Sequence, residues 1–281
     1  MSLLAVDGSL ELTDHDLTAI VRLVYEKSGI TLHEGKRALI VARLQKRVRQ
    51  GGFASFGAYL RHVQADPTGD ELTLLLDAIA TNHTSFFREP QHFTYLGEVA
   101  LPALLARAAG RPLQGWSAAC STGEEPYTLA ITLVERLGPE AGTRIRLLAS
   151  DLSTKALAIA RRGVYKAERT EGIPLSLLRT HFEKGLGAES GLVRVHQRAR
   201  ALVEFRQLNL LDLPPLGQTF DFIFCRNVMI YFDAHVQQRV VDALERHLAP
   251  AGFLFISHSE SLNAVSHGLT WAAPAIYRKR T

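Results

Sequence analysis

Two adjacent carboxylates follow a tight turn in the stretch GWSAACSTGEEPYTLAI, residues 115–131. Small residues and Gly123 leave the backbone bare enough for a cofactor to lie against it. The stretch has neither the spaced glycines of a dinucleotide site nor the Gly-Lys-Ser/Thr of a phosphate loop. Because Glu124 and Glu125 would repel a pyrophosphate, the turn favours a ligand with hydroxyl groups or a cationic centre.

A further acid and an amide follow at the ends of later segments. Asp151, in LLASDLSTKAL, ends a run typical of a strand, where an acid can grip a ribose diol. Taken alone, Asp151 could also cap the helix that STKAL begins. Asn209, in RQLNLLDLP, could read an adenine edge through its amide, although by itself it is a turn residue. Together with the first turn, the two residues favour a nucleoside ligand.

S-adenosylmethionine fits these constraints better than NAD, because it carries a ribose diol and a sulfonium cation but no phosphate. Arg88 or Arg226 could pair with the carboxylate of its amino acid end. The pattern therefore predicts a methyl donor, and the two carboxylates after the turn disfavour an NAD dehydrogenase.

The elements that must position these residues alternate between strands and helices from about residue 115 onward. β-branched and aromatic runs predict strands at 113–119, 144–151, 202–209, 220–227 and 252–258. Helical spacing predicts helices at 126–138, 153–165 and 233–250. This alternation is typical of an α/β domain with a mostly parallel sheet in three layers.

An insertion at about 166–203 interrupts the alternation. A glycine-rich turn and the alternation around Val193 and Val195 predict a small antiparallel excursion. Its exposed edge could accept a peptide strand, or the insertion could be a surface loop without a binding function.

Residues 12–75 have helical spacing throughout, with Thr13 as a cap and a further helix beginning at Ser55. One predicted helix, KRALIVARLQKRVRQGG, carries a basic face that includes Arg43, Arg47 and Arg49. That face suits an acidic partner, although a solvated face is the alternative. The joint that follows, at 76–96, is rich in aromatic residues, and its simplest interpretation is a linker helix whose phenylalanines pack into a core, at positions Phe86, Phe87 and Phe93.

Composition describes an ordinary globular chain of 281 residues, 47% hydrophobic and 21% charged, with a net charge of +4. No apolar run reaches the roughly 18 residues of a membrane span, and the acidic start is unlike a secretory signal, so we expect a cytoplasmic protein without membrane insertion. Cys120 and Cys225 are expected to be small buried residues. Because neither cysteines nor histidines have the spacing of metal ligands, we predict no metal.

Blocks of sequence along nearly the whole chain resemble the chemotaxis receptor methyltransferases, the CheR family. The blocks are TNHTSFFREPQHF, WSAACSTGEEPYTLAI, ASDLSTKALAIARRGVY, FDFIFCRNVMIYFD and GFLFISHSESL, in that order. The resemblance implies a Rossmann-like class I methyltransferase domain with a small antiparallel β-subdomain, preceded by a small all-α domain. It also implies an S-adenosylmethionine-dependent protein-glutamate O-methyltransferase that acts on cytoplasmic helical bundles of chemoreceptors and releases S-adenosylhomocysteine.

The same resemblance assigns residues one by one. The cofactor contacts it implies are Asn82, Thr84, Arg88, Glu125, Asp151, Asn209, Leu210, Arg226 and Asn227. Arg88 is expected to pair with the methionine carboxylate, and Glu125 is preferred to Glu124. Arg43, Arg47 and Arg49 match the receptor-docking surface. The segment 185–195 matches a β-subdomain that captures a receptor's C-terminal pentapeptide in some members. The expected organisation is a docking domain at 1–75, a linker at 76–100 and a methyltransferase domain at 101–281, acting as a monomer.

The chemistry itself needs no general base, since a glutamate with an ordinary pKa of about 4.3 is already ionised at neutral pH. In-line displacement at the sulfonium methyl requires proximity and alignment, so we assign Arg88 and Tyr231 to positioning. Two alternatives remain open here: a methyltransferase for RNA or a small molecule, and a non-catalytic module that senses the cofactor. The helical region lacks the usual RNA platforms, and we therefore expect no nucleic-acid partner.

Overall fold

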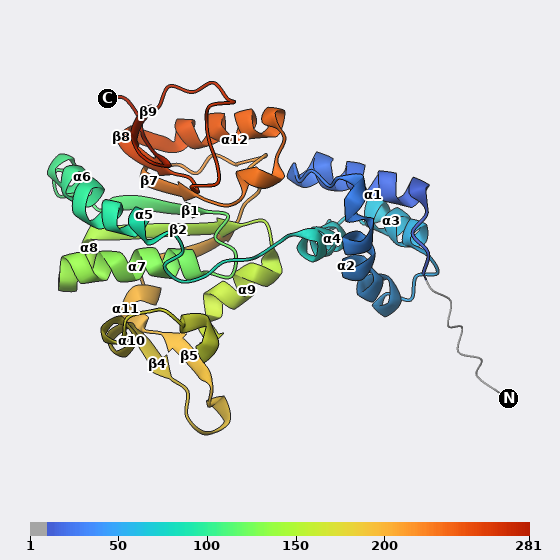
Figure 1. Cartoon of the computed structure of the whole chain (residues 1–281), viewed down its shortest axis with the longest axis horizontal. Helices are drawn as coiled ribbons and strands as arrows, with labels where there is room; N and C mark the ends of the chain where they lie inside the picture. The colour runs from blue at the N-terminus through green and yellow to red at the C-terminus, as the bar shows by residue number, and fades with distance from the viewer. Residues whose placement is uncertain (1–9) are drawn as a thin grey trace. The chain divides into compact units, whose positions relative to one another are not determined.

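The computed structural model describes residues 10–281, apart from the side chain of Glu34, and divides the chain into two compact units between Thr81 and Asn82 (Figure 1). The division falls inside the segment 76–100 that was expected to be a linker. Within that segment, the last helix of the first unit ends at Ile79, and a helix of the second unit begins at Pro90.

The first unit is all-α among its described residues, as predicted. Its elements are α1 (Asp14–Ser28), η1 (Glu34–Lys36), α2 (Arg37–Gln50), α3 (Phe56–Ala65) and α4 (Asp70–Ile79). Thr13 accepts a hydrogen bond from the amide of Asp16, and Ser55 accepts one from Ala58, so both residues cap helices where the sequence placed them. Ile20, Ile40 and Tyr59 are fully buried in this unit.

The second unit is built on a mixed sheet, which confirms the predicted α/β class. In spatial order its strands are β6 (Val203–Gln207), β2 (Ile145–Asp151), β1 (Leu113–Ala118), β7 (Phe220–Cys225), β8 (Leu248–Phe255), β10 (Ile276–Arg278) and β9 (Thr270–Ala273). The first five are parallel to their neighbours, and β10 and β9 are antiparallel. The five parallel strands were predicted; the two short antiparallel ones were not.

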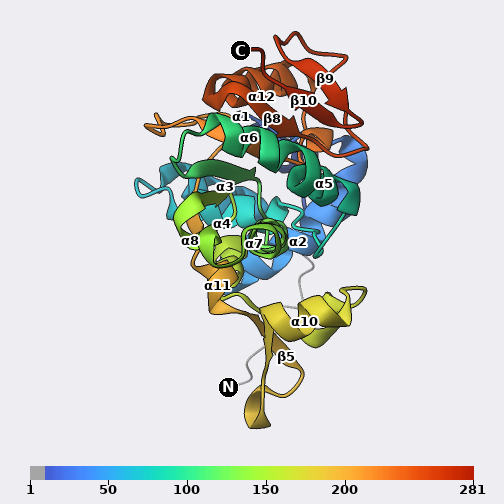
Figure 2. The same cartoon turned by 90° about the vertical axis from the view of Figure 1, so that its left-hand side faces the viewer.

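Helices cover both faces of this sheet, and adjacent residues of β1 show it. The ring of Trp116 lies 6.0 Å from that of His247 on α12, whereas Ser117 donates a hydrogen bond to Glu125 on α7. Because successive strand residues point to opposite faces, α12 and α7 lie on opposite sides of the sheet (Figure 2). The helices of this unit are α5 (Pro90–Tyr95), η2 (Leu96–Ala100), α6 (Leu101–Arg107), α7 (Glu124–Leu137), η3 (Gly138–Glu140), α8 (Ala141–Arg144), α9 (Thr154–Arg162), η4 (Ala167–Thr170), α10 (Leu175–His181), η5 (Gly187–Glu189), α11 (Gln197–Arg200), η6 (Met229–Tyr231) and α12 (Ala234–His247).

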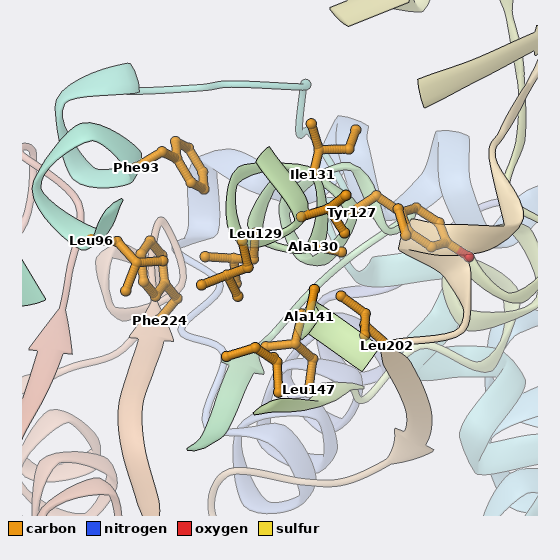
Figure 3. Packing of buried hydrophobic residues seen from close by; sticks show 14 of the residues in the cluster. Phe93, Leu96, Tyr127, Leu129, Ala130, Ile131, Ala141, Leu147, Leu202 and Phe224 are labelled. Atoms are coloured by element: carbon orange, nitrogen blue, oxygen red, sulfur yellow. The ribbon is translucent and has the colours of Figure 1, made fainter. Parts of the chain in front are cut away.

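The main core lies between α7 and the sheet, and Figure 3 shows its packing. Leu129 of α7 and Phe224 of β7 are fully buried there, together with side chains from α5 and η2. Phe86 and Phe93 join this core and Phe87 packs against it, as predicted for the aromatic joint. The expected linker helix is wrong, because residues 80–89 are not helical and the backbone at Phe87 and Glu89 has positive φ angles. Burying such a side chain contributes roughly 1.5–3 kcal/mol. The joint is therefore held firmly against the sheet domain.

The insertion forms the small antiparallel sheet that was predicted. It consists of β3 (Val164–Lys166), β5 (Leu192–Val195) and β4 (Phe182–Lys184), with β5 in the centre. Its two outer strands leave edges along β3 and β4. Across residues 10–281, none of the helices combines the length and the apolar character that crossing a membrane requires.

Candidate active site

The loop after β1 has an unusual backbone. Ala119 and Ser121 adopt left-handed φ angles of 65° and 52°, and Gly123 adopts 97°. Such angles cost a non-glycine residue about 1–3 kcal/mol, and they persist where the surroundings fix them. A Cβ at Gly123 would lie 2.7 Å from the Cβ of Ala160, so only glycine fits there. The turn that opened the sequence interpretation is thus a tightly packed loop at the carboxyl end of β1.

Asp151 ties this loop to the end of β2. Its two carboxylate oxygens accept hydrogen bonds from the amides of Ser121 and Ser153, at 2.7 and 2.8 Å. The cap of α9 is Ser153, which accepts from the amide of Ala156. The helix-cap alternative for Asp151 is therefore wrong. The Asp151 carboxylate thereby fixes the loop after β1 against the residue that caps α9.

The adjacent acids Glu124 and Glu125 have different surroundings. Glu124 is fully buried, and its carboxylate pairs with Arg169 and accepts a hydrogen bond from the Thr122 hydroxyl at 2.6 Å. Glu125 accepts from Ser117 at 2.7 Å, and its side chain remains 12% exposed. Glu125 is thus the acid of the pair that a ligand could reach, in line with the preference expressed from sequence.

Arg226 lies behind the site, with a side chain only 1% exposed. Its guanidinium is 3.1 Å from the carboxylate of Glu125 and 3.3 Å from that of Glu89, and it donates to the Arg88 carbonyl at 2.6 Å. It also lies over the ring of Phe93, 5.5 Å from the centroid. Burial raises the pKa of Glu125, and the Arg226 cation offsets part of that effect.

The segment that begins the second unit lies against these loops. Asn82 reaches the Ser153 hydroxyl at 3.4 Å, and the carbonyl of Thr84 accepts from Arg169 at 3.0 Å. Arg88 is half-buried and donates to the carbonyl of His83 at 3.1 Å. The residues on either side of Arg88 both have positive φ angles. The peptide that presents Arg88 is therefore held in a strained but well-bonded turn.

The segment after β7 is held by a carboxylate that sequence reasoning missed. Glu260 accepts hydrogen bonds from four backbone amides, those of Asn227, Val228, Met229 and Ser257, at 2.8–3.1 Å. Burial raises the pKa of Glu260, and these amides offset part of the effect. The turn they form ends at Tyr231. The only signal for Glu260 in the sequence was its place in the block GFLFISHSESL, to which no function had been assigned.

Asn209 and Leu210 lie in the turn after β6. The Asn209 side-chain oxygen accepts from the amide of Leu211 at 3.0 Å, and Leu210 is 9% exposed. Both cysteines are free and buried, and burial raises the pKa of each thiol, so the prediction of small buried residues at Cys120 and Cys225 is confirmed.

The fold also gathers Glu89, His92 and His258, whose nearest ligand atoms lie within 4.8 Å of one another. Linear spacing gave no sign of this cluster. Its geometry suits hydrogen bonding better than a metal ion: the two imidazole rings stack at 4.5 Å with 10° between their planes, so they cannot both direct a lone pair at one ion. His258 bonds Glu89 at 2.8 Å, and the Arg226 cation lies beside the same carboxylate.

The chain matches two protein-family models and several known relatives. Residues 82–273 match the family model described as CheR methyltransferase, SAM binding domain, and residues 15–80 match CheR methyltransferase, all-alpha domain. The chain is 41% identical over 266 residues to chemotaxis protein methyltransferase 2 of Pseudomonas aeruginosa, covering 94% of this chain and 93% of that protein. It is 38% identical over 276 residues to the chemotaxis protein methyltransferase of Escherichia coli, covering 98% and 94%.

Among solved structures, the N-methyltransferase NodS of Bradyrhizobium japonicum WM9 overlaps 69% of this chain and 97% of its own, at 15% identity and a TM-score of 0.39. That likeness is too low for an inference. The two family models, by contrast, together span most of the chain, and both relatives match over nearly their full lengths. The chain belongs to the CheR family of S-adenosylmethionine-dependent methyltransferases.

Proposed function

We propose that this enzyme is a protein-glutamate O-methyltransferase that transfers the methyl group of S-adenosylmethionine to glutamates on the cytoplasmic helices of chemoreceptors. The match of residues 82–273 to the cofactor-binding domain of the family carries the proposal. The relatives in Pseudomonas aeruginosa and Escherichia coli, both named chemotaxis protein methyltransferases, support the choice of pathway. A substrate of this kind puts the reaction in the cytoplasm.

The residues around the carboxyl ends of the strands suit the parts of the cofactor. Asp151, at the end of β2, would accept from the ribose diol, and the turn at Asn209 and Leu210 would hold the adenine. Arg88 would pair with the methionine carboxylate, while Glu125 would receive the ammonium group or the sulfonium end. Asn82 and Thr84 would line the same site. S-adenosylmethionine supplies an electrophilic methyl group at its sulfonium.

Arg226 has a supporting role in this proposal. Its guanidinium already lies beside Glu89 and Glu125 and donates a hydrogen bond to the carbonyl of Arg88. We therefore assign it to orienting Glu125 and Arg88 for the cofactor. Asn227, which donates to the Ser257 hydroxyl at 2.6 Å, helps to fix the turn that ends at Tyr231.

The transfer itself would be an in-line displacement. The substrate glutamate attacks as the carboxylate, the bond from its oxygen to the methyl carbon forms, and the bond from that carbon to sulfur breaks. Charge on both partners fades in the transition state, so a tight ionic grip on either would slow the step. Arg88 and Tyr231 would accordingly act by alignment and by excluding water.

Receptor docking would involve α2. Some basic residues of this helix support its packing, and others are exposed. Arg47 bonds Glu71 through two nitrogens, at 2.7 and 2.6 Å, and Arg43 donates to the carbonyl of Ile79 at the end of α4. These two side chains support the packing of α2 on α4. Arg49 and Lys46 are exposed and would face the acidic receptor bundle.

The edges of the small sheet along β3 and β4 would suit a C-terminal receptor peptide that adds as a further strand. Residues 185–195, which include the turn between β4 and β5, would contribute to that contact. We propose that the enzyme works as a monomer, without nucleic acid and without a metal.

The test is transfer of labelled methyl from S-adenosylmethionine to chemoreceptor membranes of the host, followed by mild alkali. A carboxyl methyl ester releases methanol under alkali, whereas methylated nitrogen does not. We expect alkali-labile label in the receptor with the native enzyme and none with Arg88→Ala. Label that stays in the protein after alkali, or label in RNA, would contradict the proposal.

A further inference from the structure

One cation from the insertion reaches the most deeply buried acid of the cofactor loop. Arg169, in η4, pairs with the carboxylate of Glu124, and the same nitrogen donates to the Thr84 carbonyl at 3.0 Å. The Glu124 side chain is fully buried, while that of Arg169 is 38% exposed. Because a buried carboxylate without a partner is costly, the ion pair with Arg169 offsets the burial of Glu124.

A second group of side chains from the insertion contacts the loop after β1 and the segment that carries Thr84. The hydroxyl of Tyr165, on β3, donates to the Thr122 carbonyl at 2.8 Å. The ring of Phe86 packs against the rings of Tyr165 and Phe182. In each pair the ring centroids are 5.2 Å apart and the angle between the ring planes is 83°. The insertion therefore packs against both the loop after β1 and the segment that carries Thr84 and Arg88.

We propose that Arg169 is a positioning residue of the methyltransferase, and that the β-subdomain is part of the cofactor site in addition to any peptide docking. The inference rests on the proposed function of the site. Glu124 is anchored from the insertion side by Arg169, and the next residue, Glu125, points to Ser117 and Arg226 on the sheet side. Fixing Glu124 thus fixes the first turn of α7 and the direction of Glu125.

The hydrogen bond from Arg169 to the Thr84 carbonyl fixes the segment that carries Arg88. Thr84 and Arg88 belong to one short segment, whose end is fixed by the hydrogen bond from the Phe87 amide to the Thr128 hydroxyl, at 3.1 Å. Thr128 in turn donates to the Glu124 carbonyl at 2.7 Å. One guanidinium therefore holds two strained segments at a fixed separation, and the cofactor must fit both.

A purely stabilising ion pair would predict a different response to mutation. Arg169→Gln leaves a buried, unpaired carboxylate, which draws water or shifts the loop to regain a partner. Adding Glu124→Gln removes the charge that needed Arg169 but does not restore the link to Thr84, so the double variant should regain only part of the lost affinity for the cofactor, whereas a purely stabilising pair would allow full recovery. Arg169→Lys keeps a cation for Glu124, but its flexible stem holds the carboxylate and the Thr84 carbonyl less rigidly than the planar guanidinium does.

The experiment is calorimetric titration of the full-length variants with S-adenosylhomocysteine, at a temperature where circular dichroism shows each to be folded. We expect Arg169→Gln to bind roughly tenfold more weakly, because it leaves a buried carboxylate without its partner. Arg169→Lys should be intermediate, and Arg169→Gln with Glu124→Gln should recover only part of the affinity. Arg179→Gln, which changes an exposed arginine on α10 of the same insertion, should bind as the native enzyme does.

Kinetics separate positioning from general stability. Arg169→Gln should raise the KM for S-adenosylmethionine while leaving the KM for the receptor unchanged. If the folded Arg169→Gln enzyme binds S-adenosylhomocysteine with native affinity, or if adding Glu124→Gln restores native affinity in full, Arg169 does not position the site and the inference is overturned. If the native enzyme itself fails to bind S-adenosylhomocysteine, the proposed function fails first, and this inference with it.

Discussion

At the scale of single residues, Arg226 shows why a charged side chain in a cofactor domain need not touch the cofactor. Its guanidinium lies between Glu89 and Glu125, two mostly buried carboxylates that share it as a cationic partner. Burial raises the pKa of Glu89, but Arg226 and the hydrogen bonds from Ser257 and His258 outweigh it, lowering the pKa to about 2. One buried cation thus lowers the pKa of both acids against the effect of burial.

Removing that cation should cost more than removing a surface one. We expect Arg226→Gln to lower the free energy of unfolding by about 3–5 kcal/mol, the usual penalty when a buried ion pair loses one partner. Urea unfolding at pH 7 measures it. Arg206→Gln is the matched control, because Arg206 bonds Glu204 on the surface of β6 and should cost at most about 1 kcal/mol. Equal losses in the two variants would contradict a central role for Arg226.

His92 should make the enzyme sensitive to mild acid. Burial, reinforced by the Arg226 cation, lowers the pKa of His92 from its ordinary 6.5 to about 3. Between those two pH values the unfolded chain binds a proton that the folded chain does not. Stability contributed by neutral His92 is therefore complete above pH 6.5 and falls as the pH drops, by up to about 1.4 kcal/mol per unit.

His92→Phe tests this prediction while keeping an aromatic ring beside Phe224 and Phe255, which pack against His92 at 6.4 and 5.9 Å. Urea midpoints at pH 7 and pH 5 should differ less in His92→Phe than in the native enzyme. This window lies above the range where Glu89 titrates. His235→Asn, an exposed change on α12, should keep the native pH dependence. An unchanged slope in His92→Phe would show that His92 is not the acid-sensitive group.

At the scale of elements, α2 divides its basic residues between packing and exposure. The linear sequence could show that Arg43, Arg47 and Arg49 lie on one helix. It could not show that Arg47 bonds Glu71 or that Arg43 bonds the end of α4. A docking function is therefore argued most strongly for Arg49, which is exposed in the last turn of α2.

Reversing the charge at Arg49 should weaken recognition of an acidic receptor without disturbing the cofactor. We expect Arg49→Glu to raise the receptor KM about tenfold at low salt, through loss of electrostatic attraction. The difference should shrink at physiological ionic strength, where charges are screened beyond about 8 Å. Arg61→Glu makes the same charge change at an exposed position on α3 and should have little effect. A loss that does not depend on salt would argue against docking by charge.

The elements that could be predicted from sequence are those whose signals are local. Thr13 and Ser55 cap helices within three residues, and each of the five parallel strands contains β-branched or aromatic residues. The hairpin of β9 and β10 has strands of only four and three residues, too short for an alternation to emerge. The family was predicted correctly because its blocks are long and keep their order.

At the scale of the whole molecule, the site depends on partners that are far apart in the sequence. Glu89 bonds His258 at a separation of 169 positions, and Arg169 meets Glu124 at a separation of 45. No helical or strand periodicity encodes such pairs, so Glu89, Glu260 and Arg169 had no function in the sequence interpretation. The residues carried over from the family, by contrast, gather around the carboxyl ends of β1, β2, β6 and β7.

The division of the chain between Thr81 and Asn82 separates the expected functions. Each proposed cofactor contact, from Asn82 to Asn227, belongs to the second unit, whereas the docking arginines belong to the first. We expect a fragment of residues 82–281 to bind S-adenosylhomocysteine within about threefold of the full chain, because the unit has its own core. Its receptor KM should rise well beyond that factor. Calorimetry and receptor methylation measure the two quantities on the same preparation, after circular dichroism has shown a folded fragment. If the folded fragment did not bind S-adenosylhomocysteine, the helical unit would contribute directly to the cofactor site. If its receptor KM equalled that of the full chain, the receptor would not dock on α2.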